Sequence, residues 1–268
     1  MAVIKLSHGA HLNYEQFGSG QPIILVHGSP GDGRVWARVI KHLPSNMRAL
    51  IPDLPGYGGS DPPPCEAVQR TQAMAAAVNE LIDDCADPVW LCGHSYGGNV
   101  ALHAALDRTN RVRGLLLLEP VFTRALELAG EREALAQTHA YFRTYLMRVE
   151  LRELDAIASM VNFWFGSGAY AKLPPHVRQF LNAAAERNAK DVEAASSEAI
   201  LASELTSFAR PVLIVYGGVS HPVAQKIAKS LCELLPQARV EPLPSANHAM
   251  LDGNPRDIAE LISRFCAR

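Results

Sequence analysis

Residues 89–98 read Val-Trp-Leu-Cys-Gly-His-Ser-Tyr-Gly-Gly and decide the fold. A short apolar run leads into the pattern Gly-x-Ser-x-Gly, and helix-compatible residues follow as far as Leu102. Strand, pattern and helix in this order are typical of a sharp turn that holds one serine hydroxyl above the end of a sheet. Side chains at Gly93 or Gly97 would collide with the neighbouring strand or helix. The stretch therefore predicts Ser95 as a nucleophile.

Three further apolar runs, at residues 23–26, 115–118 and 212–215, have the same character as residues 89–92. None of them alternates apolar with polar residues, which indicates strands that are covered on both faces, as in a parallel sheet. Each run ends in a polar or glycine-bearing segment. Because chemistry gathers at the carboxyl ends of strands in open α/β sheets, we expect the functional residues at these ends.

Helical patterns fill the gaps between the runs, which predicts an α/β fold with a mostly parallel sheet. The opening segment differs, because residues 3–6 and 11–17 flank a turn at Gly9 and predict an antiparallel edge hairpin. Apolar residues at helical spacing predict helices over residues 34–43, 67–83, 96–106, 223–235 and 255–265.

The pattern changes between residues 121 and 208, where helical spacing continues without a convincing strand. We interpret this stretch as a helical lid inserted into a core formed by residues 1–120 and 209–268, although ordinary covering helices fit its charged faces equally well. The densest aromatic cluster of the chain lies here and favours a surface for an apolar substrate. The predicted substrate pocket therefore contains Phe163, Trp164, Phe165 and Tyr170.

Composition and charge indicate which classes of partner and environment to expect. The 268 residues carry a formal charge of −2, which gives no reason to expect a nucleic-acid or anionic-membrane partner. The N-terminal residues lack a signal-peptide pattern, and no apolar run has the length of a membrane span. The five cysteines are odd in number and without Cys-x-x-Cys spacing, which favours reduced thiols. We expect a cytoplasmic protein with no membrane partner, and its oligomeric state is not readable from the sequence.

A serine nucleophile needs a base, and the base is expected on a late loop. His248 follows the strand-like residues 240–243 and precedes the last predicted helix, and no other histidine is so placed. We therefore predict His248 as the base. His27, in the loop after the first apolar run, is expected to hydrogen-bond its own loop.

The oxyanion that forms during acyl transfer needs two backbone N–H donors. One is expected from Tyr96, because the first N–H groups of a helix have no partner inside the helix. The second is expected from the loop at residues 27–31, through the N–H of Ser29.

Four motifs now stand in a fixed order: residues 27–31, residues 53–60, residues 93–97 and the His248 loop. In this the chain resembles the α/β-hydrolase superfamily, in the lid-bearing branch that includes esterases, carbon–carbon bond hydrolases, epoxide hydrolases and haloalkane dehalogenases. The resemblance implies an eight-stranded, mostly parallel sheet with helices on both faces and an inserted helical lid. Epoxide hydrolases and haloalkane dehalogenases carry an aspartate as nucleophile, so Ser95 favours acyl transfer to water. No metal or organic cofactor is implied.

The acid behind the base departs from the family pattern. The usual aspartate follows the penultimate strand, where this chain has Ser220. Glu119 directly follows the run 115–118, and in this position it resembles the glutamate of some haloalkane dehalogenases. A carboxylate at the end of an apolar strand is costly to bury unless it is paired, which favours a partner such as the base. We therefore predict Glu119 as the acid, with Asp252 as the alternative. Glu119→Gln is expected to cut turnover steeply, and Ser220→Ala to leave it nearly intact.

Together these residues predict a serine hydrolase that cleaves an ester-like bond, a carboxylester or a thioester, of a small apolar substrate. It would use a Ser-His-Glu triad and an acyl-enzyme. Two alternatives stay open: a hydrolase of the carbon–carbon bond in a diketone, and a ligand receptor without catalysis on the same fold.

Overall fold

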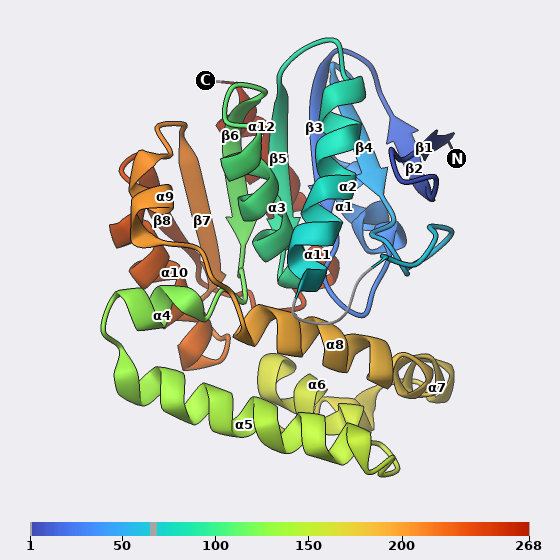
Figure 1. Ribbon diagram of the computed structural model, residues 1–268, viewed down its shortest axis with the longest axis vertical. Coiled ribbons are helices and arrows are strands. Elements are labelled where there is room, and N and C mark those ends of the chain that lie inside the picture. The colour runs from blue at the N-terminus through green and yellow to red at the C-terminus, as the bar shows by residue number, and fades with distance from the viewer. Residues whose placement is uncertain (1, 65–68, 268) are drawn as a thin grey trace.

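An eight-stranded sheet forms the centre of the protein (Figure 1). The structure is a computed structural model that describes residues 2–64 and 69–267. The strands lie in the order β1-β2-β4-β3-β5-β6-β7-β8. Their bounds are β1 (Ala2–Lys5), β2 (His11–Phe17), β3 (Gln21–Val26), β4 (Met47–Pro52), β5 (Val89–His94), β6 (Val112–Leu118), β7 (Val212–Gly217) and β8 (Ala238–Leu243).

Strand direction confirms the predicted fold class. β1 pairs with β2, and β2 with β4, in antiparallel fashion, whereas every pair from β4 to β8 is parallel. The predicted edge hairpin and the four predicted apolar runs are all strands of this sheet. β4 was missed by the sequence analysis, because its apolar run at residues 49–51 is short and follows Arg48.

Helices cover both faces of the sheet, as predicted. One face packs against α2 (Arg70–Asp84), α3 (Tyr96–Asp107) and α10 (Pro222–Leu234), and the other against α1 (Ala37–Ile40), α11 (Met250–Gly253) and α12 (Pro255–Cys266). Successive residues of β3 alternate between the two cores, Ile24 and Val26 in the first and Ile23 and Leu25 in the second. A strand buried on both sides has no polar face, which explains its continuous apolar run.

Two predicted helices differ from the observed ones. The helix predicted over residues 34–43 is instead a 3₁₀ turn at Gly33–Trp36 followed by the short α1, which ends at Ile40. Pro44 disfavours a helical conformation for Leu43, so a helix cannot extend to the end of the predicted range. The helix predicted over residues 67–83 begins partly outside the described residues, and its described part starts at Arg70. Cys65 also lies outside the described residues, and the other four cysteines are free thiols.

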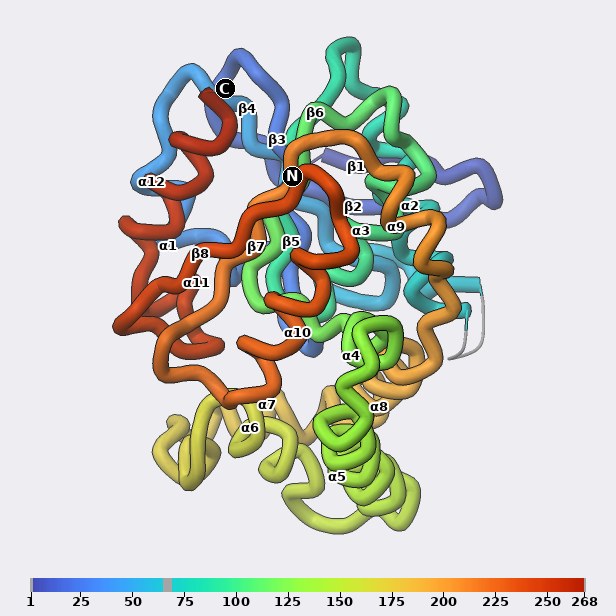
Figure 2. The backbone as a smooth tube through the Cα atoms, turned by 90° about the vertical axis from the view of Figure 1, so that its left-hand side faces the viewer, coloured from blue at the N-terminus to red at the C-terminus, as the bar shows by residue number. Residues whose placement is uncertain are grey.

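A helical insertion, residues 121–208, separates β6 from β7. All of its residues are described, and none of them forms a strand. Figures 1 and 2 show α5 to α8 gathered at one end of the sheet. The insertion contains α4 (Arg124–Leu128), α5 (Arg132–Glu150), α6 (Ile157–Phe165), α7 (Pro175–Ala183), α8 (Ala185–Ser196) and α9 (Ala202–Ser207). Its role as a lid, and the division into residues 1–120, 121–208 and 209–268, stay predictions.

Within residues 2–64 and 69–267, none of the helices combines the length and the apolar character that crossing a membrane requires.

Candidate active site

Ser95 stands at a sharp turn between β5 and α3. Its backbone has φ of +54°, a left-handed conformation that is costly for a residue with a side chain. A Cβ on Gly97 would lie 2.3 Å from the carbonyl oxygen of His27, and one on Gly93 equally close to the carbonyl of Gly97. The collisions predicted from the sequence are therefore present, and the turn can form only with glycine at both positions.

His248 lies between Ser95 and Glu119. Its Nε2 is 3.0 Å from Ser95 Oγ, and its Nδ1 is 2.7 Å from Glu119 Oε2. The His248 residue is 2% exposed and Glu119 is 1% exposed. The structure thus brings together the three residues that the sequence singled out, and their arrangement is the one that a nucleophile, its base and an acid would need for acyl transfer.

Glu119 is held by hydrogen bonds on both oxygens. Oε1 accepts from the N–H of Gly217 at 2.5 Å and from the Ser220 hydroxyl, while Oε2 faces His248. Burial acts to raise the pKa of Glu119, but its interactions with His248, and then those with Ser220 and Gly217, outweigh burial and hold the pKa below its usual range. Glu119 is therefore a carboxylate at neutral pH. Asp252, the alternative acid, pairs instead with Arg38 at 3.0 Å on the surface.

The contact between Ser220 and Glu119 was missed by the sequence analysis, which treated Ser220 only as the residue at the usual acid position. β6 and β7 are parallel neighbours, so the segments that follow them emerge side by side. A signal for this contact would have required the strand order, because adjacency of β6 and β7 brings the residue after one strand next to the loop after the other.

His94 holds the backbone of the His248 loop. Its Nε2 lies 2.9 Å from the carbonyl oxygen of His248. Burial, followed by the nearby His248, lowers the pKa of His94 to about 3, so the ring is neutral at physiological pH. Because a carbonyl can only accept, the proton of neutral His94 stands on Nε2 and donates to it.

His27 hydrogen-bonds its own loop, as expected from the sequence. The N–H of Leu54 donates to Nε2 at 2.9 Å, which leaves the ring proton on Nδ1 to donate to the carbonyl of Gly28 at 2.9 Å. The ring is fully buried, and this burial lowers the pKa of His27.

Ser29 and Tyr96 both line the space beside Ser95. A Cβ on Gly28 would lie 2.9 Å from the Cβ of Ser95, which shows how closely the Ser29 loop passes the serine. Tyr96 is the first residue of α3, so its N–H lacks a partner within the helix. Both residues are thus near the position where an oxyanion would form, and their role as donors stays a prediction.

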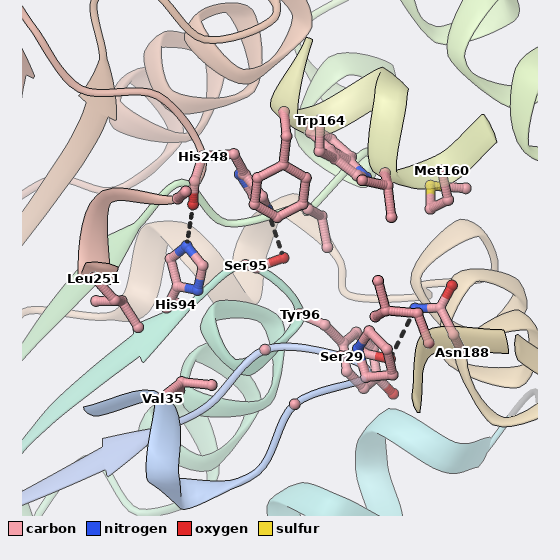
Figure 3. A pocket seen from close by; sticks show the side chains of 18 of the residues that line it. Ser29, Val35, His94, Ser95, Tyr96, Met160, Trp164, Asn188, His248 and Leu251 are labelled. Carbon is pink, nitrogen blue, oxygen red and sulfur yellow. Dashed lines mark hydrogen bonds between the residues drawn. The ribbon is translucent and has the colours of Figure 1, made fainter. Parts of the chain in front are cut away.

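A cavity of about 620 Å³ opens beside Ser95 (Figure 3). The helical insertion forms its apolar wall, which includes Phe142, Met160, Val161, Trp164 and Leu181. A wall of this kind suits an apolar acyl or alcohol group. Among residues 2–64 and 69–267, no group of three or more His, Cys, Asp or Glu side chains is arranged to hold a metal ion.

The predicted pocket residues divide into two pairs. Trp164 and Phe165 line the cavity, whereas Phe163 and Tyr170 lie outside its walls. Phe163 stacks on His221, and the Tyr170 hydroxyl donates to Asp155 at 2.5 Å. The pocket prediction is corrected for these two residues. Consecutive helical residues point in directions about 100° apart, so Phe163, Trp164 and Phe165 cannot all face one cavity.

Two polar residues of α8 support the Ser29 loop. Tyr57 donates its hydroxyl proton to Asp191, and Ser29 Oγ lies 3.1 Å from Tyr57 Oη. Burial raises the pKa of Tyr57 well above its usual value, so the hydroxyl keeps its proton. Ser29 therefore donates to Tyr57, while it accepts from the Asn188 amide at 2.9 Å (Figure 3). The insertion thus fixes a loop that reaches the candidate site.

Asp191→Ala is expected to lower the free energy of unfolding by about 3–5 kcal/mol, because it leaves the Arg70 guanidinium buried without its partner. The two side chains are 5% and 1% exposed, with Arg70 Nε against Asp191 Oδ1. Urea denaturation at pH 7, followed by circular dichroism, measures the loss. Asp252→Ala breaks an exposed ion pair with Arg38 and serves as the control, with an expected loss under about 1 kcal/mol. Equal losses in the two variants would contradict the prediction.

Comparison with known proteins places these features in context. The family model described as the alpha/beta hydrolase family matches residues 23–261. Lipase LipV from Mycobacterium tuberculosis is 37% identical over 124 residues, which cover 45% of this chain and 44% of the lipase. The alignment therefore spans less than half of that relative.

Two longer matches cover almost the whole chain. The pimeloyl-[acyl-carrier protein] methyl ester esterase from Aeromonas hydrophila is 28% identical over 262 residues, which cover 95% of this chain and 98% of the esterase. The solved structure of an esterase from Exiguobacterium antarcticum superposes with a TM-score of 0.76 at 20% identity, covering 100% of this chain and 99% of that one. At this identity the second match shows a shared fold.

Proposed function

The chain belongs to the alpha/beta hydrolase family, and from that premise we propose that it is a serine hydrolase acting on an ester-like bond, a carboxylester or a thioester, of a small apolar substrate. The observation that carries the proposal is the position of His248, 3.0 Å from Ser95 Oγ and 2.7 Å from Glu119. The catalytic residues are Ser95, His248 and Glu119.

The reaction begins when Ser95 Oγ attacks the carbonyl carbon and His248 Nε2 takes the serine proton. The N–H groups of Ser29 and Tyr96 stabilise the oxyanion of the tetrahedral intermediate. The intermediate collapses as the leaving alcohol or thiol takes the proton from His248, which leaves an acyl group on Ser95. A water molecule then gives a proton to His248 and attacks the acyl carbon, and the second tetrahedral intermediate releases the acid as His248 returns that proton to Ser95 Oγ. Glu119 stays ionised throughout and holds the proton of His248 on Nδ1.

The nature of the cavity and the names of the relatives support an ester substrate. The insertion supplies apolar walls beside Ser95, including Met160 and Leu181. The relatives reported above include a lipase and a methyl ester esterase. We infer a small-molecule partner whose apolar part enters this cavity.

A comparison of two substrates tests the reaction type. We expect kcat/KM for a short p-nitrophenyl ester to exceed that for a vinylogous diketone by roughly 100-fold, or about 2.7 kcal/mol of transition-state stabilisation. Ultraviolet and visible absorbance follow both reactions. Faster cleavage of the diketone would instead support carbon–carbon bond hydrolysis, and no turnover of either substrate would support a ligand receptor.

A further inference from the structure

Trp164 covers one face of His248. The two rings are 5.0 Å apart between centroids and inclined by 23°, a stacked arrangement. Phe165 meets the same imidazole edge-on, with centroids 5.2 Å apart and planes 79° apart. Trp164 is 8% exposed, so the contact is screened from water. Figure 3 labels Trp164, His248 and Ser95 among the residues that line the cavity, with Trp164 on the ribbon of the helical insertion.

We propose that Trp164 is a positioning residue for His248, which keeps the imidazole in line between Ser95 and Glu119 and stabilises the imidazolium that forms when Ser95 gives up its proton. This inference rests on the proposed function, because it takes His248 as the base. It assigns to the helical insertion a part in the reaction besides enclosing the substrate.

The physical basis is the electron-rich face of the indole. A cation within about 6 Å of an aromatic centroid, over the ring face, is attracted by the ring quadrupole, and most strongly by tryptophan. As the base, His248 takes the Ser95 proton and becomes cationic in the transition state. The attraction therefore grows as the reaction proceeds, which is the condition for an interaction to raise kcat.

The other groups around His248 leave this role open to Trp164. Glu119, after β6, approaches Nδ1 in the plane of the ring at 2.7 Å and supplies the one negative charge recorded in contact with the imidazole among the described residues. His94, at the end of β5, is neutral and donates to the His248 backbone. Ser95 occupies Nε2. The edges of the imidazole are thus taken by Glu119 and Ser95, and α6 covers a face with Trp164.

The test follows the His248 ring directly in the full-length protein. With histidine labelled by ¹³C and ¹⁵N, NMR records the ring signals during a pH titration of wild type, Trp164→Leu and Trp164→Phe, and His248→Gln assigns the signal. Leucine keeps water out but has no π face, so the imidazolium loses support. We expect protonation in Trp164→Leu at a pH lower by about half a unit to one unit. We also expect kcat to fall about three- to tenfold, with partial recovery of both in Trp164→Phe.

Phe163→Leu is the matched control. Phe163 also belongs to the end of α6, where its ring lies perpendicular to Trp164 with centroids 4.9 Å apart, but its face stacks on His221, with centroids 4.2 Å apart and planes 27° apart. Its replacement loosens the packing around Trp164 and leaves the indole over His248, so it should change the His248 titration and kcat clearly less than Trp164→Leu does. An equal effect in Phe163→Leu would show that α6 acts only through general packing, and would overturn the assignment to Trp164.

Two further outcomes contradict the inference. If His248 in Trp164→Leu titrates as in wild type, the stack has no electrostatic role. If it titrates at higher pH, Trp164 merely excludes water, because water that enters would solvate the imidazolium. The NMR readout needs no turnover. If the protein hydrolyses no ester, the proposed function is wrong, but the titration still shows whether Trp164 stabilises the protonated His248 ring. If the leucine variant fails to fold, Trp164→Phe, which keeps a ring in place, provides the test, because its His248 titration should still shift in the same direction by a smaller amount.

Discussion

Glu119→Gln is expected to lower kcat by about 10⁴-fold. The glutamine amide can donate a hydrogen bond to His248 Nδ1, which then becomes an acceptor and leaves the ring proton on Nε2. A protonated Nε2 cannot take the proton of Ser95, although the geometry stays nearly intact. Steady-state kinetics on a p-nitrophenyl ester measures the loss, with KM expected to change little. Retention of more than about a tenth of wild-type kcat would show that Glu119 is not the acid.

Glu198→Gln is the matched control for this variant. Glu198 is also a buried glutamate whose Oε2 meets a histidine, His103, and whose Oε1 accepts from Asn99. Neither Glu198 nor His103 lines the cavity. The control should lower thermal stability while leaving kcat nearly unchanged. Similar losses of kcat in both variants would mean that Glu119 acts through folding alone.

Ser220→Ala separates the charge of Glu119 from its anchoring. The substitution removes one hydrogen bond to Oε1, but the N–H of Gly217 and the contact with His248 remain. Since the carboxylate keeps its charge and a donor, we expect a fall in kcat smaller than about tenfold. This is close to the nearly intact turnover expected from the sequence, with a small loss that the observed contact explains.

Ser95→Ala is expected to lower kcat on the order of 10⁶-fold, because no atom remains to form the acyl-enzyme. Ser230→Ala, which replaces a buried serine on α10 away from the cavity, serves as the control and should leave kcat unchanged. Circular dichroism of both variants checks that the fold is retained. Hydrolysis that persists in Ser95→Ala at a measurable fraction of the wild-type rate would assign the reaction to another group.

Much of the fold could be predicted because strands buried on both faces leave a strong signal. β3, β5, β6 and β7 each contain a continuous apolar run. β4 was missed because its run is shorter and Arg48 interrupts the apolar pattern. The helix predicted over residues 34–43 was too long, since periodicity alone does not register the effect of Pro44 on the turn before it.

In the candidate site, too, some features could be predicted from the sequence and others could not. Ser95 and His248 could be found because the strand, turn and loop around each are visible locally. The prediction of Glu119 combined its position after four leucines, its resemblance to the glutamate of some haloalkane dehalogenases and the cost of burying an unpaired carboxylate. The bond from Asn188 to Ser29 joins residues 159 positions apart and has no local signal. Trp164 and Phe165 contact His248 and Phe163 does not, and this depends on how α6 is rotated against the core, which packing decides.

The identity of the nucleophile can be measured directly with a fluorophosphonate, which reacts with an activated serine and not with an idle one. Intact-mass spectrometry after incubation at neutral pH, followed by peptide mapping, counts and locates the adducts. We predict one adduct per chain, on Ser95, that is absent in Ser95→Ala and forms much more slowly in Glu119→Gln. An unlabelled wild-type protein, or an adduct on a different residue, would contradict the assignment of Ser95 as the nucleophile.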